Sequence, residues 1–461
     1  MRNSFARHLF PTVFGGSLIA TGIFLAPINC FLQAVLLMLC AFILYFYISI
    51  FVAEKNWWDI RAVFSATWIF TIGLASLRLL GYQRLWETAT WIIMAVAYVM
   101  FYIGATVSGL WAERVLKYME NKKPVCIGKF IFEFQQNRLF WICFVVTLIG
   151  MSCFLINVAI RGYIPYFSDS PTAYLDFYTR FHVFSVASTI VSGLCYYTLK
   201  TQRLPVWKRL FLYISILYAT FIFPMLVVSR GAFLTSALAL TTAVFYLNKR
   251  RFLILVLSAI VIVVFFMEGT SARNYTDDYL RDAFEIPETS ETSCSMNPTA
   301  AFVYSYFTVS HDNLNEAIRL TEHHTYGARH FMPFNVIFRF DAINRVIENA
   351  ENHFVKENLN TNNIAGDAYY DFGHIGVLIS IFLYAVIFGM IQSFYLRGKG
   401  PFALLALGNT MTPVTLCFFA SWMSVFSQWL LWGTTFLMFL AASISRRECA
   451  NKLCETMEGI Q

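Results

Sequence analysis

Charged side chains are scarce in this chain of 461 residues. Asp, Glu, Lys and Arg make up 13% of it, whereas hydrophobic residues make up 58% and aromatic residues 18%. Soluble globular proteins carry about 25% charged residues. The deficit excludes a soluble enzyme and predicts that the chain folds in a lipid bilayer. The formal net charge is +7, and its placement along the chain is more informative than its total.

Familiar catalytic and metal-binding motifs are also missing. The chain contains no internal repeat, no Gly-rich phosphate loop, no HExxH and no nucleophile elbow. Its ten cysteines lie mostly in apolar segments or basic loops, which argues against a disulfide framework. Cys449 and Cys454 lack the spacing and companions of zinc ligands. The sequence therefore predicts neither a metal site nor a bound cofactor.

Long apolar runs, in contrast, occur throughout the chain. A membrane helix needs roughly 20 apolar residues. The first run lacks a small-residue cleavage site, so we expect a retained helix rather than a signal peptide. The predicted fold is an all-α polytopic bundle of about twelve transmembrane helices. We expect spans at residues 9–28, 30–53, 63–80, 89–110, 139–160, 183–199, 207–228, 232–247, 252–268, 374–395, 402–420 and 424–443.

Basic residues concentrate in every second loop, beginning with the N-terminus. Because cytoplasmic loops carry the excess of Lys and Arg, this alternation predicts that both termini are cytoplasmic. It divides the chain into nine spans with short loops (1–268), one large extracytoplasmic loop (269–373) and three spans with a cytoplasmic tail (374–461). The basic residues are Arg2, Arg7, Arg114, Lys117, Lys122, Lys123, Lys129, Arg138, Lys200, Arg203, Lys208, Arg209, Lys249 to Arg251, Arg397, Lys399, Arg446, Arg447 and Lys452.

The large outer loop has a composition of its own. It holds fifteen acidic residues against seven basic ones, of which six are arginine, and six of the eight histidines lie in or beside it. An acidic outer loop follows from the retention of lysine inside. The preference for arginine is typical of phosphate recognition, because the guanidinium binds phosphate oxygens in pairs. Two stretches show helical periodicity, "NPTAAFVYSYFTVSHDNLNEAIRL" and the amphipathic "FRFDAINRVIENAENHFVKENL", which could lie on the membrane or cap a cavity.

Polar side chains at the outer membrane boundary are candidates for function. Arg230 lies in "SRG" at the outward turn between the seventh and eighth spans, either as a headgroup anchor or facing a lipid phosphate. Arg273 follows the ninth span.

The loop re-enters the membrane at "GDAYYDFGHIG". There Asp367 and Asp371 would share a face if the segment is helical, with Tyr370 near and His374 one turn away. This cluster suits a general base, although aspartate at a helix entrance also favours the positive helix end. Gly373 and Gly376 are predicted turn and close-packing positions.

Together, the topology, the Ser229-Arg230-Gly231 turn and the stretch from Asp367 to Gly376, with Asp371-Phe372-Gly373, resemble Wzy-type oligosaccharide repeat-unit polymerases, the O-antigen polymerases of bacteria. The resemblance implies a GT-C-like glycosyltransferase of the bacterial inner membrane. Its donor would be a glycan on undecaprenyl diphosphate, and its acceptor the non-reducing sugar of a lipid-linked repeat unit. A chain-length regulator and a flippase are candidate partners, and nucleic acid is not one.

This reaction assigns roles to the candidate residues. Cations should stabilise the diphosphate leaving group, and a base should accept the proton of the attacking hydroxyl. No cofactor or metal is required. The catalytic candidates are Asp367, Asp371, His374 and His330; the diphosphate candidates are Arg230 and Arg273, then Arg329 and Arg339; the weaker sugar candidates are Tyr369, Tyr370 and Asn363.

Three alternatives share much of this pattern. An O-antigen ligase would use the same donor with a lipid A-core or protein acceptor. A lipid-oligosaccharide flippase would suit twelve spans, but transporters place polar groups at mid-span, often in paired repeats, and these spans are nearly free of charge. A structural or regulatory membrane protein could bind a partner through the outer loop. The polymerase is the preferred interpretation.

Overall fold

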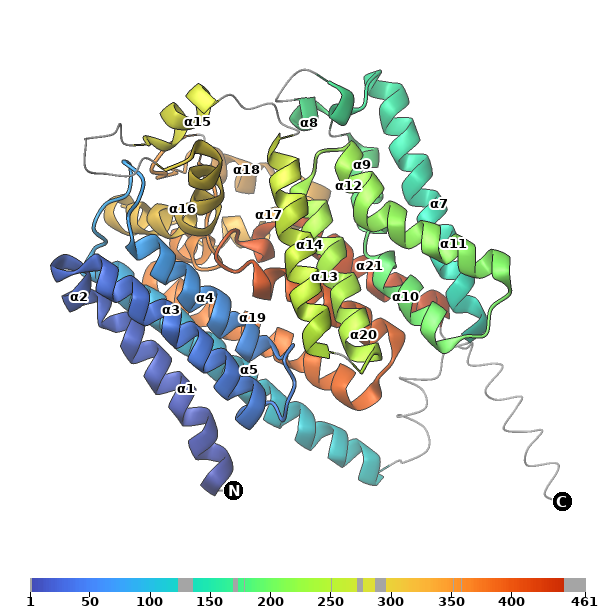
Figure 1. The fold of residues 1–461 in the computed structure, drawn as a ribbon, viewed down its shortest axis with the longest axis horizontal. Helices are drawn as coiled ribbons and strands as arrows, with labels where there is room; N and C mark the ends of the chain where they lie inside the picture. The colour runs from blue at the N-terminus through green and yellow to red at the C-terminus, as the bar shows by residue number, and fades with distance from the viewer. Residues whose placement is uncertain are drawn as a thin grey trace.

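The computed structural model is helical throughout the part of the chain that it describes, with no strand there (Figure 1). It describes residues 2–122, 136–168, 173–177, 179–249, 251–271, 277–286, 296–350, 352–357 and 359–442. The helices of the outer region are named where they are discussed. The others are α1 (Arg2–Ala20), α2 (Gly22–Ile28), α3 (Cys30–Tyr47), η1 (Ile48–Val52), α4 (Ile60–Ser76), α5 (Thr88–Lys122), α7 (Gln136–Arg161), η2 (Pro165–Phe167), α8 (Ala173–Asp176), α9 (Arg180–Ser188), α10 (Val191–Thr201), α11 (Val206–Leu217), η3 (Tyr218–Ile222), α12 (Phe223–Leu226), α13 (Arg230–Leu247), α14 (Arg251–Ser271), α19 (Gly366–Gly398), α20 (Pro401–Thr415), η4 (Trp422–Ser424) and α21 (Phe426–Ala442).

Eight helical segments in the described residues are long and apolar enough to cross a membrane, and three shorter apolar helices accompany them. The prediction of a polytopic helical membrane protein is confirmed. Each of the twelve predicted spans coincides with a helix or with consecutive helices. The predicted spans at 63–80, 402–420 and 424–443 correspond to α4, α20 and α21, helices of 17, 15 and 17 residues that are shorter than the predicted spans.

The bundle packs through small residues. α5 lies along α19, and a Cβ added at Gly104 would come within 2.6 Å of the Phe382 carbonyl oxygen. α13 packs on α20 in the same way, with Gly408 against the backbone of Ala239. Glycine and alanine at these crossings let helix backbones approach closely, which is how helices associate when the surrounding solvent is as apolar as their side chains.

Helix α19 is kinked at the point where the chain enters the bundle. It begins at Gly366, earlier than the predicted start at residue 374, and its backbone leaves the helical region at Phe372 (φ −143°, ψ 19°) and Gly373 (φ 61°, ψ −145°). Asp371 is therefore the last helical residue before the kink. A Cβ at Gly376 would lie 2.1 Å from the Ala368 carbonyl oxygen, so the two limbs of the helix meet closely there.

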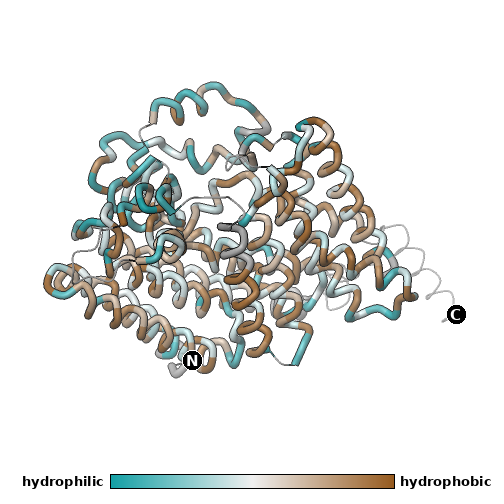
Figure 2. Tube along the Cα trace, turned by 45° about the horizontal axis from the view of Figure 1, so that its top comes forward, coloured by the Kyte–Doolittle hydropathy of each residue, from teal (hydrophilic) through white to brown (hydrophobic). Residues whose placement is uncertain are grey.

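The described residues of the predicted outer loop form four helices, α15 (Asp277–Phe284), α16 (Pro298–Leu320), α17 (Ala328–Phe338) and α18 (Asp341–Glu348). In Figure 1, α15 and α16 lie at the end of the molecule away from the N-terminus, and Figure 2 shows hydrophilic residues gathered at that end. The predicted helix in "NPTAAFVYSYFTVSHDNLNEAIRL" is confirmed as α16. This helix packs against α4 and is largely buried.

The second predicted helix of the outer region is shorter than expected. α18 ends at Glu348, although the apolar periodicity continues to Phe354. Beyond it, the His353 backbone N–H donates to the Tyr370 hydroxyl at 2.9 Å and the Val355 N–H donates to the Asn313 side chain at 2.9 Å. These tertiary hydrogen bonds hold the backbone out of a helix, so the prediction of a helical face reaching Phe354 is wrong.

Two titratable groups are buried where α16 enters the bundle. The Asp312 carboxyl accepts hydrogen bonds from Gln83 Nε2 and Trp86 Nε1, each at 2.8 Å. Burial raises its pKa to about 7, although these two hydrogen bonds oppose the shift. The neighbouring His311 ring contacts the Thr71 hydroxyl at 3.0 Å, and burial lowers its pKa to about 3. The helix is thereby fixed to α4 and to the loop that follows it by buried polar contacts.

Candidate functional site

Asp371 is the centre of one candidate site. Its side chain has no solvent exposure, and its two oxygens accept hydrogen bonds from the backbone N–H groups of Arg329 (3.1 Å) and His330 (3.0 Å). The Thr325 hydroxyl donates to the same carboxylate. These two N–H groups lie in the first turn of α17, whose N-cap is Gly327, so Asp371 caps a helix that lies 41 residues away in sequence.

The same carboxylate holds the His330 ring. His330 Nδ1 lies 2.5 Å from Asp371 Oδ2, and the ring stacks on Tyr384 with centroids 5.9 Å apart. When Nδ1–H donates to the carboxylate, the lone pair is on Nε2. Nε2 is buried and has no hydrogen-bond partner among the described residues. Buried polar atoms are normally hydrogen-bonded, and a substrate hydroxyl would be a suitable partner for Nε2.

Arg329 places a cation beside this pair. Its guanidinium lies over the Tyr370 ring at 3.9 Å, donates to Asn352 Oδ1 at 2.8 Å and stands 3.7 Å from Asp367 Oδ1. Asp367 also accepts a hydrogen bond from Asn362. Asp367 and Asp371 therefore do share the helical segment before the kink, as the spacing predicts, but they contact different partners. Asp367 faces the arginine, and Asp371 faces the histidine.

His374 lies outside this cluster. It is exposed beyond the kink, and its ring contacts Tyr369 edge-on with centroids 5.6 Å apart. The Tyr369 ring also contacts the His324 ring edge-on, with centroids 6.0 Å apart. The kink at Gly373 turns His374 away from Asp371, so the two do not meet one turn apart as a continuous helix would predict.

Arg230 defines a second candidate site at the start of α13. It is 6% exposed, its Nη1 donates to the Tyr306 hydroxyl at 2.5 Å, and its guanidinium lies 4.8 Å from the Phe302 ring centroid. Both aromatic residues belong to α16. A buried guanidinium held between aromatic rings is positioned with little freedom, because cation–π contacts and the hydrogen bond fix its plane.

Two neighbouring cavities lie on this side of the molecule, and Arg230 lines one of them. One, of about 440 Å³, is mainly apolar and is lined by Arg230, Leu234, Ile262, Phe307, Phe418 and Trp422 among others. The other, of about 200 Å³, is lined by tyrosines and polar groups, including Tyr174, Tyr279, Ser305 and Asn360. Both cavities include Tyr306 and Phe419 in their walls. An anionic group at Arg230 would thus border the apolar cavity, and Tyr306 would connect it to the polar, aromatic one.

The two candidate sites are neighbours through η4. Trp422 of η4 lines the apolar cavity, and η4 also contacts α17, whose first turn carries Arg329 and His330. Phe334 of α17 further packs against Trp429 of α21 at 5.0 Å between ring centroids. The segment from α20 to α21 therefore forms a shared wall.

The remaining predicted residues lie elsewhere. Arg339 is exposed at the C-terminal end of α17, in a left-handed conformation (φ 53°). Asn363 is fully buried, where its amide contacts Ser310 and His311 and caps Ala365. The hydroxyls of Tyr369 and Tyr370 donate to the backbone carbonyls of Ile318 and His353. Arg273 lies outside the described residues.

Comparison with known protein families establishes the kinship of this chain. Residues 29–412 match the family model whose description is "Putative O-antigen polymerase". The chain belongs to the O-antigen polymerase family. No curated protein and no solved structure matches it. The resemblance drawn from the sequence is confirmed, and the matched region contains Arg230, Arg329, His330 and Asp371.

Membership in the O-antigen polymerase family gives the chain a general function. It is an integral membrane protein of the kind that builds bacterial surface polysaccharide at the inner membrane, with glycosyltransferase-like polymerase activity. A lipid-linked oligosaccharide is the class of substrate. This membership favours an enzyme over the transporter and the structural protein.

Several residues that complete the two sites of this O-antigen polymerase carry little signal in the sequence. Thr325 donates to Asp371, Tyr384 stacks on His330, and Tyr306 holds Arg230. Thr325 lies in "HHTYG", and its polar neighbours were a weak signal. Tyr306 and Tyr384 lie in apolar helical stretches, where aromatic residues are ordinary packing residues, so no local signal identified them.

Proposed function

We propose that this member of the family transfers a glycan chain from undecaprenyl diphosphate to the non-reducing end of a lipid-linked repeat unit. The reaction would take place on the outer face of the inner membrane, with both termini in the cytoplasm. One observation carries the proposal: the buried guanidinium of Arg230 lines an apolar cavity, and Tyr306, which accepts its hydrogen bond, also lines an aromatic, polar cavity. A polyprenyl diphosphate sugar likewise joins an apolar chain, an anion and a sugar.

The donor is assigned to this site by chemistry. The prenyl chain would occupy part of the 440 Å³ apolar cavity, which is lined by side chains of α13, α14, α16 and the segment after α20. The diphosphate would meet Arg230, whose fork binds phosphate oxygens in pairs. The first sugar would face Tyr279, Ser305 and Asn360 in the 200 Å³ cavity. Aromatic faces and hydroxyl or amide groups together suit a sugar ring.

The acceptor chemistry is assigned to His330. A hydroxyl oxygen of the acceptor sugar attacks the anomeric carbon of the donor, and the bond from that carbon to the diphosphate oxygen breaks. His330 Nε2 takes the hydroxyl proton, and undecaprenyl diphosphate leaves with the electron pair. Fixed cations stabilise the charge that develops on the leaving oxygen. Arg230 is the first such cation, and Arg329, which precedes the base in the chain, is the second.

Asp371 is a positioning residue in this scheme. Its contact with Nδ1 orients the ring and stabilises the imidazolium that forms when Nε2 gains a proton. Its contacts with the first turn of α17 place His330 relative to the kink of α19. His374 and Asp367 keep secondary roles as candidates, because His374 is turned away and Asp367 is engaged by Arg329.

Deletion of the gene in its host, followed by complementation, tests the proposal. A polymerase null should leave the surface anchor capped with a single repeat unit, whereas loss of a ligase should leave no repeat unit and accumulate lipid-linked polymer. Arg230→Ala should reproduce the single-unit pattern at normal protein level in the membrane. Arg281→Ala is the matched control, because Arg281 is an exposed arginine of α15 in the same region. A normal ladder of chain lengths in the deletion strain refutes the proposed polymerase activity. A normal ladder in the strain that carries Arg230→Ala refutes the assignment of the donor site to Arg230.

A further inference from the structure

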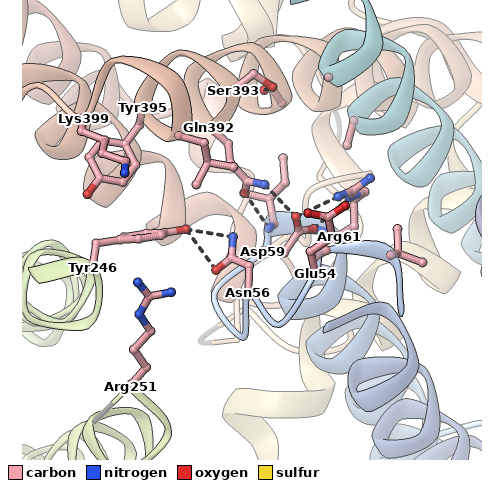
Figure 3. Close-up of a pocket in the computed structure, with 17 residues that line it drawn as sticks. Glu54, Asn56, Asp59, Arg61, Tyr246, Arg251, Gln392, Ser393, Tyr395 and Lys399 are labelled. Atoms are coloured by element: carbon pink, nitrogen blue, oxygen red, sulfur yellow. Dashed lines mark hydrogen bonds and ion pairs between the residues drawn. The ribbon is translucent and has the colours of Figure 1, made fainter. Parts of the chain in front are cut away.

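A third cavity lies at the other end of the bundle. It has a volume of about 480 Å³, and its walls come from the ends of η1, α13 and α19 and from the starts of α4 and α14 (Figure 3). Helix α19 carries Asp371 near one end and Gln392 of this cavity near the other. From the kink at Gly373, α19 runs 19 residues to Gln392, a length of about 28 Å at 1.5 Å per residue. Likewise, α13 begins at Arg230 and reaches the cavity at Tyr246. The cavity is therefore separate from the candidate active site.

One wall of the cavity is a self-contained polar network. The Asp59 carboxylate accepts hydrogen bonds from Nε and Nη2 of Arg61, each at 2.9 Å, and from Gln392 Nε2 at 2.7 Å. Gln392 also accepts from the Ile60 N–H at 2.9 Å, and Asn56 donates to the Tyr246 hydroxyl at 3.1 Å. The charges of Asp59 and Arg61 cancel within this network, which ties α4, α13 and α19 together. The hydrogen bonds of this wall form without a ligand.

The opposite wall carries cations that are not neutralised. Figure 3 shows Arg251 and Lys399 on the side of Tyr246 and Tyr395, away from Asp59 and Arg61. The guanidinium carbon of Arg251 lies 5.7 Å from the centroid of the Phe245 ring. Within the described ranges, neither Arg251 nor Lys399 has a hydrogen bond or ion pair through its side chain. Glu54 is the remaining acid of the lining, so two free cations face one carboxylate.

The backbone around the cavity is also unusual. Glu54 (φ 50°) and Lys399 (φ 49°) both adopt the left-handed conformation, and neither is glycine. Such residues cost free energy and concentrate at binding and catalytic sites, where the surrounding structure holds them. The conformation of Lys399 ends α19 and keeps the side chain at the cavity.

We propose that this cavity binds a phosphate group, carried either by an anionic lipid headgroup or by a soluble phosphate compound. Arg251 and Lys399 supply a fork and a point charge, a combination suited to phosphate oxygens, and the hydroxyls of Tyr246 and Tyr395 add hydrogen-bonding groups. Glu54 can accept a hydrogen bond from a hydroxyl on the other substituent of the phosphate. The volume lies within the range of ligand pockets. The site is independent of the polymerisation chemistry.

Binding is tested on the purified full-length protein, without reference to its activity. In one arm the protein is reconstituted with phosphatidylglycerol and examined by native mass spectrometry for a retained lipid. In the other arm the lipid-depleted protein in detergent is titrated with inorganic phosphate, and its melting temperature is recorded. The test variant is Arg251→Gln with Lys399→Gln. The matched control is Lys200→Gln with Arg203→Gln, which removes one exposed lysine and one exposed arginine outside the cavity.

The two arms separate the sources of the phosphate. Retention of lipid by the wild type and the control, reduced about tenfold or more in the test variant, identifies a lipid headgroup. A phosphate-dependent rise in melting temperature with the same variant pattern identifies a soluble ligand. The proposal is overturned if the wild type shows neither, or if the test variant binds as well as the control. If the double variant is not monodisperse, Lys399→Gln alone is used, with the same expected direction.

Discussion

At the scale of single residues, the Asp371 carboxylate caps α17 and orients His330, and one substitution separates these roles. In Asp371→Asn, an oxygen at the Oδ1 position can still accept from the Arg329 N–H, whereas the acceptor of the His330 N–H at the Oδ2 position is lost. The amide N–H₂ would instead face His330 Nδ1 and favour the tautomer with its proton on Nε2, which cannot act as a base. We expect the protein to fold but the rate of polymer formation to fall about 10²- to 10⁴-fold.

The measurement is polymer formation by purified protein from lipid-linked repeat units, together with its melting temperature. Asp367→Asn is the control, because Asp367 contacts Arg329 and does not touch the histidine. It should lower the rate much less. A full rate in Asp371→Asn would show that Asp371 only caps the helix.

A second residue-scale prediction concerns Asp312 and pH. Its folded pKa of about 7 lies above its ordinary value of 3.8, so between these values the folded state holds a proton that the unfolded state releases. The contribution of Asp312 to the free energy of unfolding is therefore greatest below about pH 4 and falls as the pH rises to about 7. The fall is on the order of a few kcal/mol, because each pKa unit corresponds to about 1.4 kcal/mol.

Melting temperatures of the wild type and Asp312→Asn between pH 4.5 and 8 test this dependence. The difference between the two proteins should contain the Asp312 contribution, since other titrating groups are common to both. The groups around Asp312 are Gln83, Trp86, Glu316 and Arg78, with His311 next in sequence. His311 stays neutral across this range because burial lowers its pKa to about 3. Parallel curves for the two proteins would contradict the prediction.

At the scale of elements, the kink of α19 depends on Gly373. Its backbone (φ 61°, ψ −145°) is a conformation that L-residues rarely adopt, and an added Cβ would lie 3.0 Å from His324 Nε2. Gly373→Ala should therefore lower the free energy of unfolding by about 1–3 kcal/mol. It should also shift Asp371 relative to α17 and reduce polymer formation beyond the loss of folded protein.

Gly433→Ala is the matched control for this change. Gly433 lies within α21, and a Cβ there meets nothing within 4 Å. Alanine is favoured over glycine inside a helix, so this variant should be as stable as the wild type or more stable. Equal melting temperatures and rates for Gly373→Ala and the wild type would mean that the kink is not required.

Elements differ in how far the sequence predicts them. The twelve apolar segments coincide with helices because length and apolar composition are local properties of the chain. The helix over Gly366–Asp371 and the kink after it depend on contacts between distant segments, such as Thr325 N–H to the Tyr370 carbonyl oxygen. The sequence also did not predict the end of α18 at Glu348, because a contact of the same kind ends that helix.

The candidate sites show the same division. Arg230 and Asp371 stood out because polar groups at a membrane boundary are costly. Their partners Tyr306 and His330 are 76 and 41 residues away along the chain. A single sequence cannot pair residues at such separations, and it placed His374, rather than His330, beside Asp371.

At the scale of the whole molecule, both candidate sites lie at one end of the bundle. The cavity lined by Arg251 and Lys399, proposed to bind phosphate, lies at the other. This arrangement requires a single orientation in the membrane. The positive-inside pattern predicts that the loop at Arg203 is cytoplasmic and that the region around His323, between α16 and α17, is outside. Both residues are exposed, so a cysteine at either position should be open to a label.

His323→Cys and Arg203→Cys, each in a background with the native cysteines replaced, test the orientation with a membrane-impermeant maleimide on cells whose outer membrane is permeabilised. His323→Cys should be labelled directly, because its side chain would face the compartment where polymer is made. Arg203→Cys should be labelled only after the inner membrane is opened. The cysteine-free background provides the control for nonspecific labelling. The reverse pattern would place Arg230 and His330 in the cytoplasm, where the lipid-linked units are not presented for polymerisation in the proposed reaction, and would refute the assignment of both sites.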